Sequence, residues 1–173
     1  MHFKHASLKE GTIADILVHG LYHNIDDRGL LYEMCRNDWS HYKQIVERGA
    51  GSGQIQQVYV VRNHNDCVRA FHKHELLIDL FCIVEGHARF IFIDDRPHSL
   101  SFQCYQSMYV TSVSPRLIFV PAGVFHGWAA PKGTILISLA TELYKGKNKQ
   151  DDLDEERIAW DTLGADVWDI QNK

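Results

Sequence analysis

The chain has 173 residues, a formal net charge of −4 and 45% hydrophobic residues. A chain of this size and mild acidity holds one domain with its own core, and it lacks the basic surface that nucleic-acid binding requires. No apolar stretch approaches the roughly 20 residues of a membrane helix. We therefore expect neither a nucleic acid nor a membrane as a partner.

The cysteines and the first residues indicate where the protein works. The four cysteines form no C-x-x-C pair, and Met1–His5 lacks the apolar segment of a secretory signal. Scattered thiols in a chain of this kind are typical of reduced, structural cysteines. The sequence therefore predicts a cytoplasmic protein.

Taken in chain order, the sequence predicts three segments within a single domain of residues 1–173. Residues 1–53 form an N-terminal arm that ends in a glycine-rich loop. Residues 54–145 contain short runs of β-forming residues with turn signals about every ten residues, which is typical of a sandwich or barrel. Residues 146–173 form a tail in which the acidic run 151–160 predicts a short helix with a solvated acidic face.

Four polar residues stand at a characteristic spacing within the predicted strands. They read H-x-H, four residues, Asp, and later P-x-G-x-x-H, and they are His72, His74, Asp79 and His126. Residues two apart on a strand point to one face, so His72 and His74 can converge. Three imidazoles and a carboxylate suit Fe, Mn, Zn or Ni. The same residues could instead form a base with a substrate cradle, or be buried polar residues hydrogen-bonded at a barrel mouth.

This spacing resembles the two cupin motifs, with Asp79 where Glu is usual. It predicts an all-β cupin jelly roll (double-stranded β-helix) with an N-terminal arm and a short C-terminal helix. Further segments resemble the dTDP-4-dehydrorhamnose 3,5-epimerase family of cupins. They are residues 26–29 with Glu33, 67–72, 94–96 with Ser99 and Phe102, 119–128, 141–144 and 156–161.

The resemblance implies roles for particular residues. His72 matches the general base that removes a proton next to the C4 ketone of a nucleotide-linked 4-keto-6-deoxy sugar. Asp161 is the nearest match to the carboxylate that pairs with this base, and Arg69 matches a contact to the diphosphate. The resemblance assigns nucleotide contacts, often across a dimer interface, to Arg28 and Glu33, and positions in the pocket to Gln57 and His126.

Two positions depart from the family pattern. Asp79 stands where the family has a lysine that stabilises the enolate, and an anion there would repel it. The family's catalytic tyrosine falls on Leu139, which cannot donate a proton, so Tyr144 is the candidate substitute. A metal ion bound by His72, His74, Asp79 and His126 could replace the lost ammonium. If His72 binds the metal, however, Tyr144 or a metal-bound hydroxide must act as the base.

Three functions follow as hypotheses. The leading one is an epimerase acting on a nucleotide-linked 4-keto-6-deoxy sugar in polysaccharide biosynthesis, which requires no cofactor. By the resemblance, this enzyme is expected to be a homodimer. The second hypothesis is a metal-dependent cupin isomerase or oxygenase. The third is a sugar-binding cupin without catalytic activity, favoured by the missing lysine and tyrosine.

Overall fold

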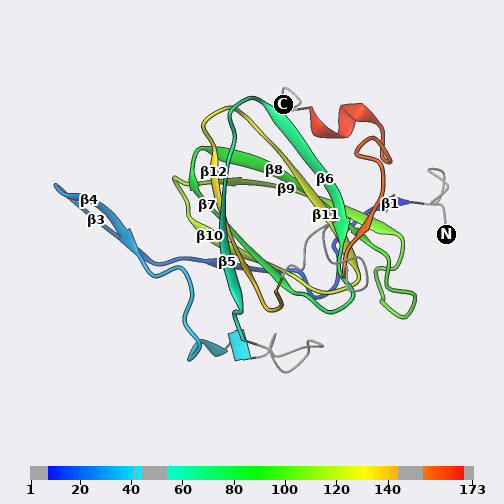
Figure 1. Cartoon of the computed structure of the whole chain (residues 1–173), viewed down its shortest axis with the longest axis horizontal. Helices are drawn as coiled ribbons and strands as arrows, with labels where there is room; N and C mark the ends of the chain where they lie inside the picture. Colours follow the sequence, from blue (N-terminus) through cyan, green and yellow to red (C-terminus); the bar gives the residue numbers. More distant parts are fainter. Residues whose placement is uncertain (1–7, 41, 44–53, 144–153, 170–173) are drawn as a thin grey trace.

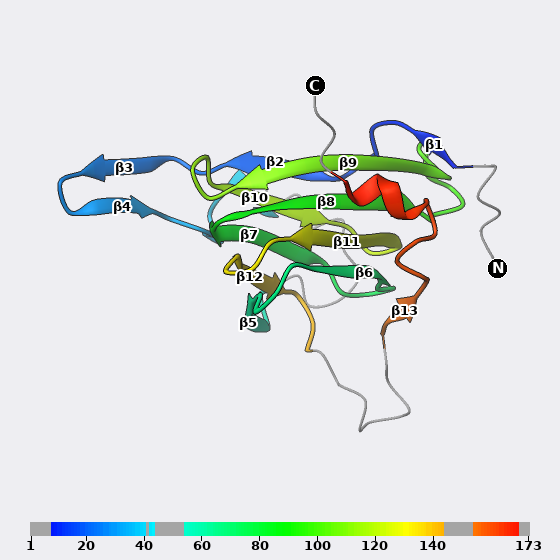
Figure 2. The same cartoon turned by 90° about the horizontal axis from the view of Figure 1, so that it is seen from above.

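A computed structural model describes residues 8–40, 42–43, 54–143 and 154–169. Two mainly antiparallel sheets face each other, and a separate two-stranded hairpin projects from them (Figures 1 and 2). The predicted all-β cupin jelly roll is confirmed. No helix in these described ranges is long and apolar enough to span a membrane.

The larger sheet has six strands, and their spatial order brings distant segments together. In that order they are β1 (Lys9–Glu10), β9 (Cys104–Thr111), β8 (His87–Asp94), β11 (Val124–Ala130), β6 (Cys67–Lys73) and β13 (Glu156–Arg157). All neighbours run antiparallel except β1 and β9.

The second sheet has five strands, and the hairpin follows its first strand in the chain. The order is β2 (Leu17–Gly20), β10 (Arg116–Val120), β7 (Asp79–Glu85), β12 (Ile135–Ala140) and β5 (Gln57–Arg62), and the hairpin consists of β3 (His23–Asp26) and β4 (Gly29–Tyr32). Consequently β5, the last strand of this sheet, lies near β6 and the two-residue strand β13 at the end of the other sheet (Figure 2).

Alternation along the strands separates the core into layers. On β7, Phe81 and Ile83 pack between the sheets, whereas Leu80 and Cys82 belong to a second cluster with residues of the N-terminal segment. This is the period-2 pattern of a strand buried on both faces. The outer face of the six-stranded sheet carries a third cluster, which the C-terminal segment covers through Trp168.

The predicted helix at 151–160 is wrong for the residues that the structure describes. Glu156–Arg157 forms β13 on the edge of β6, and a short 3-10 helix follows at Ala165–Trp168. The ammonium of Lys73, whose side chain is 8% exposed, lies 2.6 Å from both Asp95 and Glu156. A buried ammonium requires such partners, so this pairing outweighs the helical preference of the acidic run.

Replacing Lys73 by methionine is expected to lower the free energy of unfolding by about 2 kcal/mol. The change keeps the apolar stem and leaves two partly exposed carboxylates without their cation, a case between surface and buried ion pairs. Urea unfolding measures the effect, with the exposed Lys132→Met as the matched control. An unchanged urea midpoint would show that β13 is held by its backbone pairing alone.

Candidate active site

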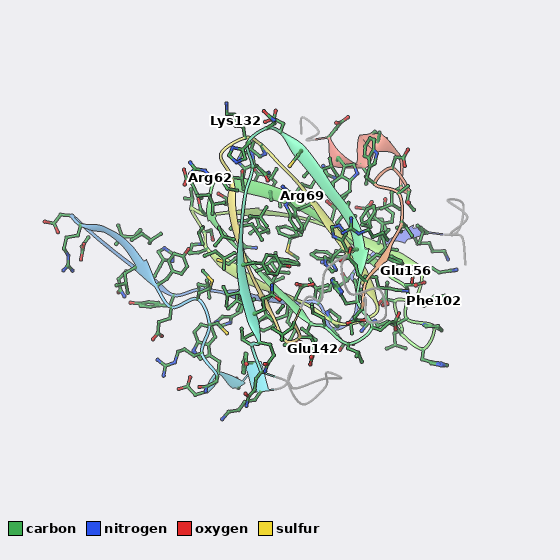
Figure 3. All side chains as sticks on the ribbon, in the orientation of Figure 1. Arg62, Arg69, Phe102, Lys132, Glu142 and Glu156 are labelled. Carbon is green, nitrogen blue, oxygen red and sulfur yellow. The ribbon has the colours of Figure 1, made fainter. Side chains whose placement is uncertain are left out.

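A cavity of about 550 Å³ opens where the neighbouring edges of the two sheets meet. The cavity is lined by side chains from β5, β6, β11 and the segment around β13, and Arg69 extends into this region from β6 (Figure 3). Its polar lining consists of Gln57, Tyr59, Arg69, His72, His74, Glu155 and Arg157. A concave site with a few converging polar groups is typical of small-molecule binding.

His72 lies in the wall of this cavity. On β6 it is in register with His126 of β11 and with Arg157 of β13. Burial, and next the neighbouring His126, lower the pKa of His72 to about 4. The imidazole is therefore unprotonated at neutral pH, which is the form that accepts a proton.

The carboxylate near His72 is Glu155, and Asp161 lies elsewhere. The Glu155 side chain is 9% exposed, lines the cavity and forms an ion pair with Arg157. Its charge acts on His72 in the direction that raises the pKa. Asp161 is exposed in a turn, so the structure does not bring it together with His72 as the resemblance implied. The extended course of β13 is the physical reason for this difference.

Behind the wall, three ligand-bearing side chains converge. His74, Asp79 and His126 are 8%, 2% and 3% exposed, and their ligand atoms lie within 4.8 Å of one another. The Asp79 Oδ2 atom lies 3.3 Å from His126 Nε2 and 3.6 Å from His74 Nε2. His72 is not part of this group, so the predicted four-residue set is reduced to three.

Asp79 is ionised in this setting. Burial opposes its charge, but hydrogen bonding and charge from His126, together with His74 and Ser138, outweigh burial and hold the pKa of Asp79 below its usual value. A carboxylate, rather than an ammonium, lies at the inner end of the site.

Tyr59 is a site residue that the sequence analysis missed. It lies on β5, between the cavity-lining residues Gln57 and Val61, and its hydroxyl interacts with Ser138 and Asp79. Burial and the charge of Asp79 raise the pKa of Tyr59, so the phenol keeps its proton. The alternation of Gln57, Tyr59 and Val61 on one strand face is the signal that could have revealed it.

The sequence offered two positions for the catalytic tyrosine of the family, Leu139 and Tyr144. Leu139 packs in the cluster on the outer face of the five-stranded sheet, whereas its neighbour Ser138 points inward and donates a hydrogen bond to Asp79 Oδ1. Tyr144, the predicted substitute, lies outside the described residues. Within those residues, Tyr59 is the tyrosine in the cavity lining.

Arg28 and Glu33 lie far from the cavity of their own chain. Arg28 is on the hairpin turn and pairs with Asp26 at 2.5 Å, and Glu33 follows β4 and pairs with Arg36 at 2.9 Å. The hairpin extends away from the two sheets (Figure 1). Of the predicted substrate contacts, Gln57 and Arg69 line the cavity, and His126 lies buried behind its wall.

A jelly roll with an unprotonated imidazole and arginines at its open edge has the architecture of a cupin-fold sugar isomerase. The family model described as dTDP-4-dehydrorhamnose 3,5-epimerase matches residues 10–167. The chain belongs to this family. Membership makes the protein an epimerase, so the expectation of an enzyme is confirmed.

Curated relatives and a solved structure agree with this assignment. The chain is 31% identical over 153 residues to the "probable low-salt glycan biosynthesis epimerase Agl13" of Haloferax volcanii, covering 87% of this chain and 90% of the relative. It is 30% identical over 156 residues to the "spore coat polysaccharide biosynthesis protein SpsL" of Bacillus subtilis, covering 88% and 94%. It shares the fold of RmlC from Legionella pneumophila, solved with dTDP-4-keto-L-rhamnose, with a TM-score of 0.74, 17% identity, and coverage of 96% and 85%.

Proposed function

We propose that the protein epimerises a nucleotide-linked 4-keto-6-deoxy sugar for polysaccharide or glycan synthesis. Family membership and the names of the two relatives support the reaction class and the pathway type. The observation that carries the proposal is the unprotonated imidazole of His72 in a cavity whose opposite side is formed by Tyr59.

The proposed chemistry uses these two side chains in sequence. His72 removes a proton from the carbon next to the ketone, and the electrons of that C–H bond move to the ketone oxygen to give an enolate. Tyr59 comes from the opposite sheet and donates its phenolic proton to the other face of the same carbon. Exchange with solvent then returns His72 to its neutral form and Tyr59 to its protonated form.

The substrate diphosphate is proposed to lie at the cavity mouth. Arg69 and Arg157 both line the cavity, and Arg69 is exposed there. Guanidinium groups bind phosphate oxygens through paired N–H donors. Gln57 on β5 adds a polar contact on the same side of the cavity as Tyr59.

Solvent exchange tests this function directly. Incubation with dTDP-4-keto-6-deoxyglucose in deuterium oxide is expected to place deuterium at C3 or C5, detected by mass spectrometry and proton NMR. Failure to exchange with every nucleotide-linked 4-keto sugar tested, whichever nucleotide it carries, would contradict the proposal and favour a sugar-binding role.

We also propose a cytoplasmic homodimer built around the projecting hairpin. Tyr22, Ile25 and Leu31 are 83%, 73% and 67% exposed, and Val58 and Val60 are exposed on the edge strand β5. Large apolar side chains gathered on projecting and edge elements favour burial against a partner. The hairpin could then carry Arg28 and Glu33 to the partner's nucleotide. The four free cysteines fit a reducing compartment.

The double variant Ile25→Asp with Leu31→Asp is expected to dissociate this dimer. Light scattering during gel filtration should give twice the chain mass of 19.9 kDa for the unaltered protein and 19.9 kDa for the variant. Val113→Asp, a change at a residue that is 84% exposed in the turn after β9, serves as the control. A monomeric unaltered protein, or a variant that remains dimeric, would contradict the interface.

A further inference from the structure

The three buried side chains behind the cavity wall have the spacing of metal ligands. Ligand atoms bound at about 2.1 Å stand about 3.0 Å apart at right angles and about 3.4 Å apart in a tetrahedron. The separations of 3.3 Å and 3.6 Å between Asp79 Oδ2 and the two imidazole Nε2 atoms are close to these values. The longer one exceeds an ordinary hydrogen bond.

The hydrogen bonds around these side chains orient their free atoms toward one point. His126 Nδ1 lies 3.1 Å from the carbonyl of Val124, and His74 Nδ1 contacts the carbonyl of Asp154. A carbonyl only accepts, so each Nδ1 carries the proton and each Nε2 presents its lone pair unless the ring is charged. Asp79 Oδ1 accepts from Ser138 at 3.2 Å, which leaves Oδ2 facing both rings. This is the outer-shell arrangement seen around metal-binding imidazoles and carboxylates.

The Asp79 carboxylate meets the two Nε2 atoms in a buried space, where the anion requires a positive charge beside it, either a proton on one ring or a metal ion. Water contributes little screening, because the three residues are at most 8% exposed. His74 also lines the cavity, so a cation bound here would have open positions on the substrate side. We propose that His74, Asp79 and His126 bind one divalent metal ion of the Mn, Fe, Co, Ni or Zn type.

The same geometry leaves His72 outside the metal centre. The described ligand atoms that lie within 4.8 Å of one another belong to His74, Asp79 and His126, and the His72 ring faces that of His126 edge-on from the cavity wall. This division removes the conflict between a metal ligand and a base, because the two roles fall on different histidines. It rests on the proposed function, in which His72 accepts the proton. His74, Asp79 and His126 would hold a divalent ion beside the cavity, and such an ion would supply the positive charge that an enolate oxygen needs.

Metal binding is tested without reference to activity. Protein stripped with a chelator is dialysed against each of the five ions, under argon for Fe²⁺, and bound metal is measured by inductively coupled plasma mass spectrometry. The Co²⁺ form is also followed by its visible absorption bands. One ion per chain is expected, together with a higher melting temperature in its presence.

Variants separate the ligands from the base. His74→Ala and Asp79→Asn are expected to weaken binding by about 100-fold or more, whereas Ser138→Ala, which removes one hydrogen bond to Asp79, weakens it about tenfold. His72→Asn and the exposed control His98→Ala should each keep the full metal content. If His74→Ala or Asp79→Asn fails to fold, the weaker metal binding of Ser138→Ala still tests the site.

The outcomes distinguish this inference from the proposed function. An unaltered protein that binds none of the five ions, or a His72→Asn variant that loses the metal as His74→Ala does, overturns the metal site. Deuterium exchange by a metal-free protein would overturn a catalytic use of the ion and leave the epimerase proposal standing. Stoichiometric metal without exchange on any 4-keto sugar would confirm the site and contradict the epimerase.

Discussion

Replacing His72 by asparagine is expected to reduce deuterium incorporation into the substrate by about 1,000-fold. General base catalysis contributes about 10² to 10⁴ in rate, and the proton removed from carbon here is weakly acidic. Asparagine keeps a polar group of similar size in the cavity wall but offers no nitrogen that can accept a proton at neutral pH. The measurement is the initial rate of exchange in deuterium oxide, followed by proton NMR.

Binding should survive this change, because the proposed diphosphate contacts belong to Arg69 and Arg157. Titration calorimetry with dTDP is expected to give affinities within about threefold for the variant and the unaltered protein. His98→Asn, on an exposed turn, serves as the matched control. Exchange retained within tenfold in His72→Asn would show that another group is the base.

The fold was predictable because its signals are local. Each short β-forming run, each turn and each of the two histidine motifs spans only a few residues of the sequence. The course of the C-terminal segment was not predictable in this way. Its acidic residues satisfy Lys73 and the loop after β6, where the Asp154 carboxylate accepts the backbone N–H groups of residues 75–77. Such long-range pairing leaves no periodic pattern in the sequence.

In the site, too, the sequence predicted residues from local spacing but missed those that distant segments bring together. The spacing to neighbouring motifs predicted that Asp79 puts a carboxylate where the family has a lysine. In the structure Asp79 lies close to His74 and His126. The tyrosine position could not be fixed, because a shift of one residue on a strand reverses the face. Leu139 points outward and Ser138 inward, while the phenol comes from Tyr59 on the adjacent strand β5. The carboxylate near His72 likewise depended on the unpredicted course of the C-terminal segment, in which Glu155 immediately precedes β13.

Replacing Tyr59 by phenylalanine is expected to separate exchange from inversion. Without the phenolic proton, the enolate can be reprotonated only from the side of His72, which restores the original configuration. Inversion at the stereocentre should fall about 100-fold, the loss of one general acid, while deuterium exchange at the same carbon stays within about tenfold of the unaltered rate. Proton NMR of the sugar distinguishes the two, because inversion changes the ring couplings and exchange removes the signal.

This split carries information that a simple loss of activity does not. If Tyr59 served only to position Asp79 and Ser138, exchange and inversion would decline together, since both pass through the same enolate. Tyr109→Phe, at a half-exposed tyrosine on β9, controls for the loss of a hydroxyl elsewhere. An unchanged rate of inversion in Tyr59→Phe would assign the second proton to a different donor. Loss of exchange in His72→Asn, combined with retained exchange in Tyr59→Phe, would place the base and the acid on opposite sheets of the fold.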